Sequence, residues 1–247
     1  MSERLEGPAG GGPARLHVVV PARDEAALLP GMLASLDLAV RALARTAGPG
    51  SRRPVAVAAT VVLDSCRDGS GEAVARAALA MPWLDSVTVA LGRVGSVRAA
   101  GVEHARATAA GTPAGDLWVA TTDADTRVPV DWLLGHVAAA RAGVELLTGT
   151  VRPDELLVAS QRRAWLAQHD LVEGHLHVHG ANLGFTLAAY DAVGGFGALA
   201  TGEDVDLVER LRRHGARSRA TAAIPVTTSA RLDGRAPAGF AAYLAEL

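Results

Sequence analysis

The sequence predicts an α/β fold with a mostly parallel β-sheet, and three observations support this prediction. The chain has 247 residues, a length that suits one α/β domain or a domain with an appended lobe. Its hydrophobic fraction is 49%, which is enough for a sizeable core. Short apolar segments of strand length alternate along the chain with segments that have the periodicity of helices.

The first half of the chain shows the most regular alternation. Leu29, Met32, Leu33 and Leu36 recur at helical spacing, which predicts a helix from residue 24 to about 45. We expect further helices at 68–80, 96–109 and 129–142, and strands at 16–20, 55–63, 87–91 and 116–122. Strands that alternate with helices in this way imply parallel pairing through right-handed crossovers.

The second half of the chain is less regular. It predicts strands at 146–151 and 175–178, and helices at 154–169, 203–214 and 237–244. Residues 1–14 are rich in Gly and Pro and are expected to be disordered. We find no repeat or boundary in the remainder, so residues 15–247 are expected to form a single domain.

Composition excludes several classes of function. The formal net charge is −2 and no basic block stands out, which disfavours a nucleic-acid partner. The lone Cys66 excludes an internal disulfide and a Cys-rich zinc site. The chain has no lysine, so a Walker A phosphate loop and Schiff-base catalysis are both excluded. Apolar runs such as 56–63 are too short to span a bilayer and no leader is recognisable, so the expected location is the cytosol, free or beside a membrane.

Acidic residues follow three of the four expected parallel strands. Glu25 follows the first strand, Asp64 the second, and Asp123 and Asp125 the fourth. In open α/β sheets, ligands bind beyond the carboxyl ends of the strands. Carboxylates gathered at that edge repel one another unless a positive group lies among them. The pattern therefore predicts a divalent cation with a phosphate ligand.

The Asp123-Ala124-Asp125 turn is the sharpest candidate for a metal site. Mg²⁺ and Mn²⁺ prefer carboxylate oxygen, often from one or two residues together with substrate phosphates. The alternative is a turn or a helix cap before Pro129, because Asp favours both positions. The turn by itself does not decide between these two readings.

A second acidic pair, Glu203-Asp204, opens the helix expected at 203–214. Asp204 falls on the same helical face as Leu207 and Leu211, so we expect it to point inward. A buried carboxylate needs a partner or a chemical purpose. The alternative is the general preference of acidic residues for a helix N-terminus.

Two further segments have both a functional and a structural interpretation. His175, His177 and His179 would share one face of a strand, which allows a zinc site but is more typical of a pocket wall or a solvated face. Beside Gly180, His179 and Asn182 are the residues expected to touch a substrate. The segment 92–98 is either a glycine turn before a helix or a phosphate cradle.

Taken in order, these motifs resemble the family 2 glycosyltransferases of GT-A fold. Residues 18–25 resemble the opening strand and its P-x-x-N-E turn, with Asp24 in place of Asn. Residues 64–68 resemble the D-G-S-x-D turn, with Ser65 and Cys66 in place of Gly and Ser. The remaining matches are 98–101 to R-N-x-G with Ala99 in place of Asn, 123–125 to D-x-D, 180–182 with 193–196 to the acceptor-side segment, and 203–204 to the E-D pair. The similarity runs from about residue 16 to 214.

The resemblance implies a Rossmann-like sheet with a nucleotide-binding half at about 15–126 and an acceptor-side half at about 127–247. It implies the metal-assisted transfer of one sugar, with inversion, from a nucleotide-diphosphate sugar to an acceptor hydroxyl. The Q-x-x-R-W element of processive synthases is not apparent, which favours single transfer. The acceptor can be a small molecule, a lipid-linked molecule or a glycan, and the resemblance names neither the acceptor nor the donor base.

Each motif carries a role that the resemblance implies. Asp204 would be the general base, with Glu203 beside it, and Asp125 with Asp123 would hold Mg²⁺ or Mn²⁺. The donor-binding residues would be Pro21, Ala22, Arg23, Glu25, Asp64, Arg98, Asp123 and Ala124. The acceptor-side residues would be His179, Gly180, Ala181 and Asn182.

Three other readings remain as alternatives. A nucleotidyltransferase also uses carboxylate-bound Mg²⁺, but the turn at 21–25 lacks the usual glycines and lysine. A non-catalytic module that binds nucleotide sugars is disfavoured by the intact acidic pairs at 123–125 and 203–204. An NAD-dependent dehydrogenase would carry a glycine fingerprint in the first strand-to-helix turn, and that fingerprint is absent.

Overall fold

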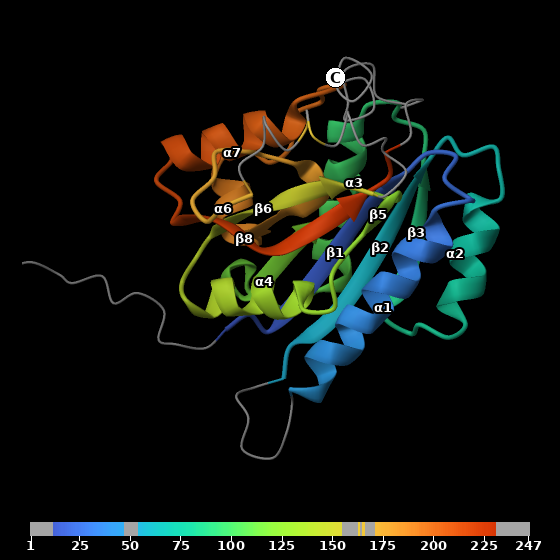
Figure 1. Cartoon of the computed structure of the whole chain (residues 1–247), viewed down its shortest axis with the longest axis horizontal. Coiled ribbons are helices and arrows are strands. Elements are labelled where there is room, and N and C mark those ends of the chain that lie inside the picture. Colours follow the sequence, from blue (N-terminus) through green and yellow to red (C-terminus); the bar gives the residue numbers. More distant parts are fainter. Residues whose placement is uncertain (1–11, 47–53, 155–162, 164, 166–170, 231–247) are drawn as a thin grey trace, which may run out of the picture.

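A computed structural model describes residues 12–46, 54–154, 163, 165 and 171–230 (Figure 1). Its centre is an eight-stranded sheet with the strand order β3-β2-β1-β4-β7-β6-β8-β5, flanked by helices. The predicted fold class, α/β with a mostly parallel sheet, is confirmed. None of the helices that the structure describes has the length and apolar character needed to cross a membrane.

The first half of the chain forms the parallel part of the sheet. Its strands are β1 (Arg15–Ala22), β2 (Ala56–Asp64), β3 (Leu84–Val89) and β4 (Leu117–Thr121). The helices that follow the first three strands are α1 (Leu29–Arg45), α2 (Ser70–Ala78) and α3 (Val94–Thr108), and the short helix η1 spans Ala114–Asp116. Strand β1 pairs in parallel with both β2 and β4, and Val18, Val19 and Val20 are fully buried. A continuous apolar run is typical of a strand that is covered on both faces.

Helix α1 begins five residues later than predicted, and the reason is local. Asp24 has a left-handed backbone with φ +52°, which a right-handed helix cannot include. Pro30 lies at the start of the observed helix, where its missing N–H group costs no hydrogen bond. Residues 23–28 therefore form a loop beyond the end of β1.

The second half of the chain completes the sheet with antiparallel insertions. Its elements are β5 (Thr126–Arg127), α4 (Trp132–Arg141), β6 (Leu146–Pro153), η2 (Gly180–Asn182), β7 (Leu183–Thr186), α6 (Leu187–Ala192), α7 (Glu203–Arg213) and β8 (Ser218–Thr228). Strand β7 runs antiparallel between β4 and β6, and β6 pairs in parallel with β8. The predicted strand at 146–151 and helix at 203–214 are confirmed within a few residues.

Several predictions for the second half are wrong or lie outside the described residues. Residues 175–179 form no strand, and the strand in this region is β7, which begins at Leu183. No pattern in the sequence predicted strands β5 and β8 or helix α6. The helix predicted at 237–244, most of the helix predicted at 154–169, and residues 1–11 lie outside the described part of the chain.

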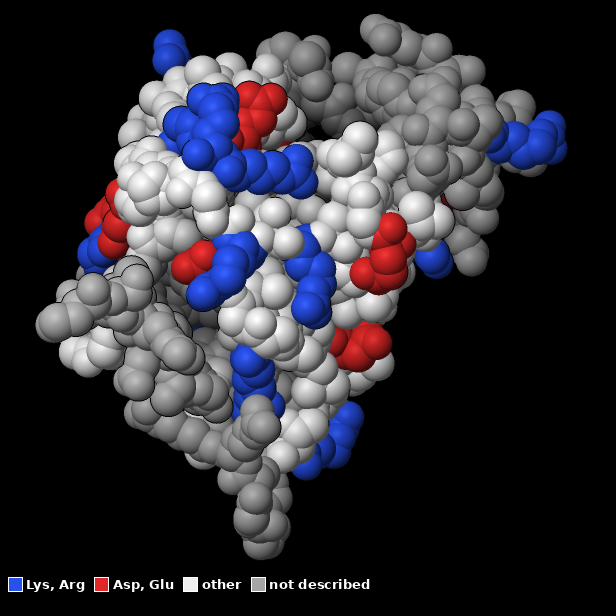
Figure 2. Space-filling view, turned by 90° about the vertical axis from the view of Figure 1, so that its left-hand side faces the viewer, with Lys and Arg blue, Asp and Glu red and all other residues white. Residues whose placement is uncertain are grey.

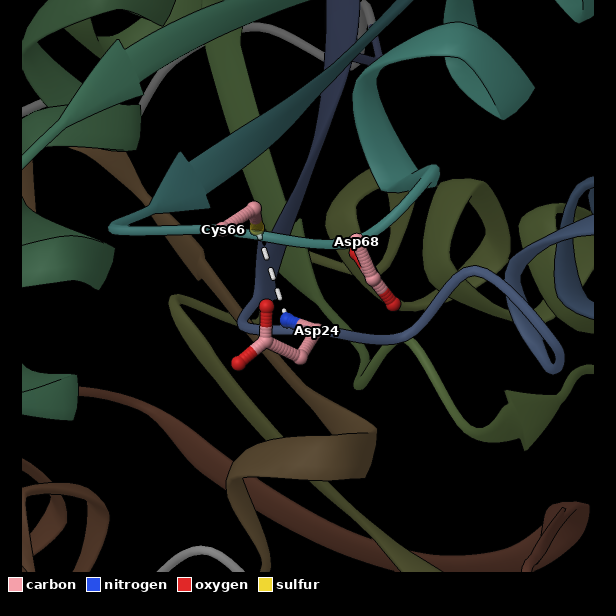
Figure 3. Close-up of side chains that lie close together, drawn as sticks. All are labelled: Asp24, Cys66 and Asp68. Atoms are coloured by element: carbon pink, nitrogen blue, oxygen red, sulfur yellow. Dashed lines mark hydrogen bonds between the residues drawn. The ribbon is translucent and has the colours of Figure 1, made fainter.

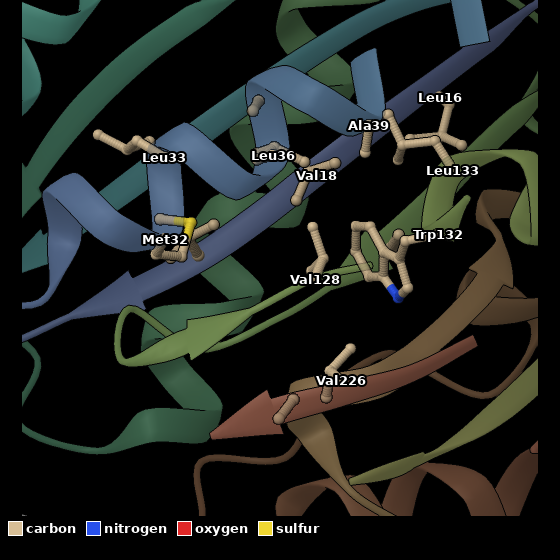
Figure 4. Packing of buried hydrophobic residues seen from close by; sticks show 14 of the residues in the cluster. Leu16, Val18, Met32, Leu33, Leu36, Ala39, Val128, Trp132, Leu133 and Val226 are labelled. Carbon is tan, nitrogen blue, oxygen red and sulfur yellow. The ribbon is translucent and has the colours of Figure 1, made fainter. Parts of the chain in front are cut away.

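Two apolar clusters place the helices on opposite faces of the sheet. One cluster joins β1 and β2 to α1 and α4, and Figure 4 shows Leu16 and Val18 of β1 beside Met32, Leu36 and Trp132. The other cluster joins β1 and β4 to α3, α6 and α7. The three layers fix the carboxyl ends of β1, β2 and β4 at one edge, where the candidate site lies.

Candidate active site

The turns that follow β1 and β2 are tied together by three side chains (Figure 3). The Asp24 amide donates to Cys66 Sγ at 3.5 Å, and the Cys66 thiol donates to the Ala22 carbonyl at 3.4 Å. Asp24 Oδ1 accepts from the Arg67 amide at 2.6 Å, and Asp68 Oδ2 accepts from the Ala26 amide at 2.9 Å. The ligand-type atoms of Asp24, Cys66 and Asp68 lie close enough to share an ion, but each side chain already bonds across the two turns. We therefore read this cluster as a brace.

Asp64 holds the loop between β3 and α3. It is buried at the end of β2, and its Oδ1 accepts hydrogen bonds from the amides of Leu91 and Gly92 at 2.8 and 3.2 Å. The Arg23 guanidinium lies 4.0 Å from Asp64 Oδ2. The loops after β1, β2 and β3 are thus in contact at one edge of the sheet.

The other donor-side residues of the first turn lie at the same edge. Ala22 and Glu25 are buried, Pro21 is half-buried, and Arg23 is exposed. The Glu25 amide donates to Ser70 Oγ at 2.8 Å, a bond that links this turn to the start of α2. A hydrogen bond from Ser70 lowers the pKa of Asp68, which keeps that carboxylate charged next to the same turn.

Arg98 joins the two acidic motifs. Its side chain is buried on α3, and its Nη2 donates to Asp123 Oδ1 at 2.6 Å. Its Nη1 donates to Glu203 Oε1 at the start of α7. The sequence places Asp123 and Glu203 eighty residues apart, and the structure brings them to the two sides of one guanidinium group.

Glu203 and Asp204 occupy different environments. Glu203 is the inward member of the pair, with 3% exposure, whereas Asp204 is half-buried. The expectation that Asp204 takes the inward position is therefore wrong, because Arg98 draws Glu203 into the interior. Asp204 Oδ2 accepts from the Gly180 amide at 2.6 Å and its Oδ1 accepts from the Val205 amide at 2.8 Å. These bonds hold Asp204 in a fixed position at the rim of the site.

The Asp123-Ala124-Asp125 turn is partly exposed, and its two aspartates have different neighbours. Ala124 is buried, the Asp123 side chain is 35% exposed, and Asp125 is half-buried with the Thr126 and Thr228 hydroxyls 3.5 and 3.4 Å from its Oδ1. In the part of the chain that the structure describes, no further His, Cys, Asp or Glu joins these two aspartates as a group of three. One or two carboxylates with the remaining positions left to phosphate and water is the arrangement that Mg²⁺ uses.

The acceptor-side segment leads into Gly180. The rings of His175, His177 and His179 stack in sequence, with centroids 5.9 and 6.1 Å apart, so they share one side as predicted although they form no strand. No trio of histidine ligand atoms lies together among the described residues, which gives the zinc alternative no support. Thr121 Oγ1 donates to the Gly180 carbonyl at 2.6 Å and fixes this segment to β4.

Asn182 is buried within the site, and its side chain bonds to three other segments of the protein. It is 1% exposed, and its Oδ1 accepts from Trp132 Nε1 at 2.9 Å. Its Nδ2 donates to the carbonyls of Thr150 and Ile224, both at 2.9 Å. These partners leave the Asn182 side chain no exposed polar atom for the expected contact with a substrate. Ala181 beside it is also buried, and His179 is half-buried.

The structure adds residues that the sequence did not single out. Thr228 of β8 lies beside Asp125: its hydroxyl accepts from Thr126 Oγ1 at 2.9 Å and donates to Asp125 Oδ1 at 3.4 Å. Arg93 donates to the Ala198 carbonyl at 3.0 Å, so the loop before α7 rests on the start of α3. Thr228 had no signal in the sequence because its strand was not predicted. Arg93 belongs to the segment 92–98, which the sequence indicated as a candidate, but its contact with the loop before α7 was not predicted.

Comparison with solved structures finds a similar fold in other proteins. TarS from S. aureus in complex with UDP matches with a TM-score of 0.63 and 14% identity over 87% of this chain and 61% of that one. The mannosyltransferase PcManGT from Pyrobaculum calidifontis in complex with GDP-Man and Mn²⁺ matches with a TM-score of 0.58 and 22% identity over 90% of this chain and 60% of that one. GalNAc-T7 with UDP, GalNAc and Mn²⁺ matches with a TM-score of 0.61 and 10% identity over 87% and 44%.

The fold is of the GT-A type. The TM-scores of 0.58 to 0.63 show a shared GT-A fold, at sequence identities of 10 to 22%. The chain spans about six tenths of the length of the TarS 1–349 chain and of PcManGT. No protein-family model matches the sequence, and a comparison with curated proteins finds no match.

Proposed function

We propose that this chain is a glycosyltransferase that moves a single sugar from a nucleotide-diphosphate sugar to an acceptor hydroxyl with inversion. One observation carries the proposal: the Arg98 guanidinium brings the Asp123-Ala124-Asp125 turn and the Glu203-Asp204 pair together at the carboxyl edge of a GT-A sheet. The order of the motifs supports membership of glycosyltransferase family 2, with residues 15–247 as one domain. TarS and PcManGT, which share the fold, are bound to UDP and to GDP-Man.

The nucleotide would lie over the loops that follow β1, β2 and β3. Asp64 stands at their centre, where its carboxylate fixes the backbone of Leu91 and Gly92. Pro21, Ala22 and Glu25 would contact the nucleotide from the side of β1, and the exposed Arg23 would supply a positive charge for an anionic ligand. Asp64 would accept a hydrogen bond from a base N–H group through Oδ2, which also accepts from the Gly92 amide.

Asp125, with Asp123, would hold Mg²⁺ or Mn²⁺ together with the donor diphosphate. The metal ion would supply positive charge to the diphosphate as it leaves. Two carboxylates on one turn, with neighbouring hydroxyls and no third acidic ligand in the described residues, fit a cation that completes its coordination with phosphate oxygen. PcManGT and GalNAc-T7 were both crystallised with Mn²⁺.

Asp204 would act as the general base. The acceptor hydroxyl oxygen forms a bond to the anomeric carbon as the bond from that carbon to the diphosphate breaks, and the diphosphate leaves with the electron pair. The hydroxyl proton passes to the Asp204 carboxylate. Glu203 cannot take this role because its carboxylate is buried against Arg98, whereas Asp204 is half-buried at the rim. Attack from the side opposite the diphosphate inverts the anomeric configuration.

Asp204→Asn should separate donor binding from chemistry. Removal of a general base should lower turnover by about 10²-fold or more, while the affinity for the nucleoside diphosphate stays the same. The measurement is the release of UDP from UDP-glucose and of GDP from GDP-mannose with Mn²⁺. Binding of UDP and GDP is measured in parallel. Asp206→Asn is the matched control, because Asp206 lies on the same helix and pairs with Arg210. Full activity of Asp204→Asn would remove it as the base, and a product that retains the donor configuration would exclude single displacement.

A further inference from the structure

We propose that Arg98 is a positioning residue that aligns the base helix α7 with the Asp123-Ala124-Asp125 turn, and that it acts on transfer without binding the donor. The inference rests on the proposed function and assigns to Arg98 a different role from the donor contact that the family resemblance implies. Three groups of contacts support it. They are the bonds from Arg98 to the carboxylates of Asp123 and Glu203, the contact with the Gly180 backbone, and the contacts with the loop that precedes α7.

The guanidinium group of Arg98 is already occupied by this chain. The residue is 4% exposed, and its two terminal nitrogens donate to Asp123 and to Glu203. Its Nε atom is buried and has no hydrogen-bond partner among the residues that the structure describes. A cation enclosed between two carboxylates in this way is held by the protein, and a diphosphate would have to displace one of those carboxylates to reach it.

Gly180 lies directly against Arg98. A Cβ atom at this glycine would be 2.5 Å from Arg98 Nη2, so any side chain here would displace the guanidinium group. The amide of the same glycine donates to Asp204 Oδ2 at 2.6 Å. Arg98 therefore contacts both neighbours that orient Asp204: Glu203, which precedes it in α7, and Gly180, which binds its carboxylate.

The start of α3 also carries the loop that precedes α7. The Gly95 amide donates to the Leu199 carbonyl at 3.2 Å, and Arg93 donates to the Ala198 carbonyl. A Cβ atom at Gly95 would collide with the Gly197 carbonyl oxygen. The contacts of Arg98 and of these residues join the donor-side loop, through α3, to the position of Asp204.

Loss of Arg98 should therefore affect chemistry more than binding. In Arg98→Gln the buried Glu203 carboxylate loses its cation, and the first turn of α7 should move away from Gly180. A misplacement of about 1 Å at a catalytic group can cost 10²-fold in rate. Among the described residues, Asp125 and the loops around Asp64 form no bond with Arg98, and Asp123 keeps its carboxylate when Arg98 is replaced. The affinity for a nucleoside diphosphate should therefore fall by less than about threefold.

The test compares Arg98→Gln and Arg98→Lys with Arg106→Gln. Arg106 is an arginine of the same helix that pairs with Asp191 and Glu103 away from the site. Three kinds of measurement are made. Calorimetry gives the Kd of UDP and GDP with Mn²⁺, and donor hydrolysis gives kcat and KM. Amide hydrogen exchange is followed in segments 178–184 and 203–207. We expect Arg98→Gln to keep the Kd and KM, to lose about 10²-fold in kcat, and to exchange faster in both segments, with partial recovery in Arg98→Lys.

A second variant keeps the inference testable if Arg98→Gln does not fold. In Arg98→Gln/Glu203→Gln the uncompensated charge is removed, so folding should recover while kcat stays low. A rise of more than tenfold in the diphosphate Kd with unchanged exchange would make Arg98 a donor ligand and overturn the inference. Unchanged kcat and exchange would overturn it as well. A wild type that binds neither diphosphate would instead overturn the proposed function, and the inference with it.

Discussion

Side chains that look equivalent in the sequence have different roles in the structure. Glu203 and Asp204 are adjacent, yet one is buried against Arg98 and the other stands at the rim and bonds to Gly180. Helical periodicity placed Asp204 inward, because it counts apolar neighbours along one helix and cannot include a buried arginine from another helix. Asn182 was misread for a similar reason: its partners Trp132, Thr150 and Ile224 come from segments that periodicity cannot place beside it.

Two buried histidines should make the protein sensitive to acid. Burial lowers the pKa of His17 to about 4 and that of His136 to about 3, from an unperturbed value of 6.5. Both side chains are neutral in the folded protein at pH 5, whereas in the unfolded chain they are mostly protonated. Stability is therefore unaffected above pH 6.5 and is lost as the pH falls below 6.5, by about 2 kcal/mol for each histidine at pH 5.

The check is urea unfolding at pH 7.5 and pH 5 for the wild type and for His17→Gln, whose side chain can keep a bond to Thr60. The difference in unfolding free energy between the two pH values should be smaller in the variant. NMR titration of the folded wild type provides an independent control. A His17 resonance that titrates near pH 6.5 would show that burial does not hold this ring neutral.

At the scale of elements, the well-predicted segments are those with strong periodicity and a single environment. Helix α7 and strands β1, β2 and β6 were found because their apolar positions recur over eight or more residues. Strand β7 has four residues and passes directly into the six-residue α6, which is too short for a periodic signal. Strand β8 is rich in Ala and Thr, and its burial alternates only toward its end, so its composition resembles that of many other segments.

Helix α3 is the element on which the site depends most, and its packing on the sheet can be tested. A Cβ atom at Gly101 would collide with Val19 of β1 and lie 2.9 Å from Val62 of β2. Gly101→Ala should overpack this contact and destabilise the fold by about 1–3 kcal/mol, whereas Gly115→Ala, where nothing lies within 4 Å, should change stability little. Thermal unfolding of the two variants measures the difference. Equal stability of both would contradict the close approach of α3 to the sheet.

At the scale of the whole molecule, the site forms where the two halves of the chain meet. Strand β7 inserts antiparallel between β4 and β6, which places Gly180 and the start of α7 beside the turn after β4. The order of the motifs along the sequence predicted residues that the structure brings together at one edge of the sheet. It could not predict which of them touch, because the antiparallel insertion and the buried arginine that connect them leave no periodic pattern.

Charge is mixed on the side of the molecule that Figure 2 shows. Figure 2 shows arginine side chains spread over one side of the molecule with acidic side chains among them. Exposed pairs such as Arg213 with Glu209 and Arg217 with Glu145 join the two signs. Exposed pairs of this kind contribute little to stability, so the distribution bears on solubility and on association more than on the fold.

The most direct test of the central claim is a thermal-shift screen of UDP, GDP, ADP and TDP, each with and without Mn²⁺. A ligand that binds the folded state raises its apparent stability, by about 2.7 kcal/mol at one hundred times Kd. The account predicts a rise in melting temperature with one diphosphate that requires Mn²⁺, is lost in Asp125→Ala and is kept in Asp131→Ala, a change at an exposed aspartate beyond the turn. No rise with any diphosphate, or a rise that survives Asp125→Ala, would contradict a metal-dependent donor site.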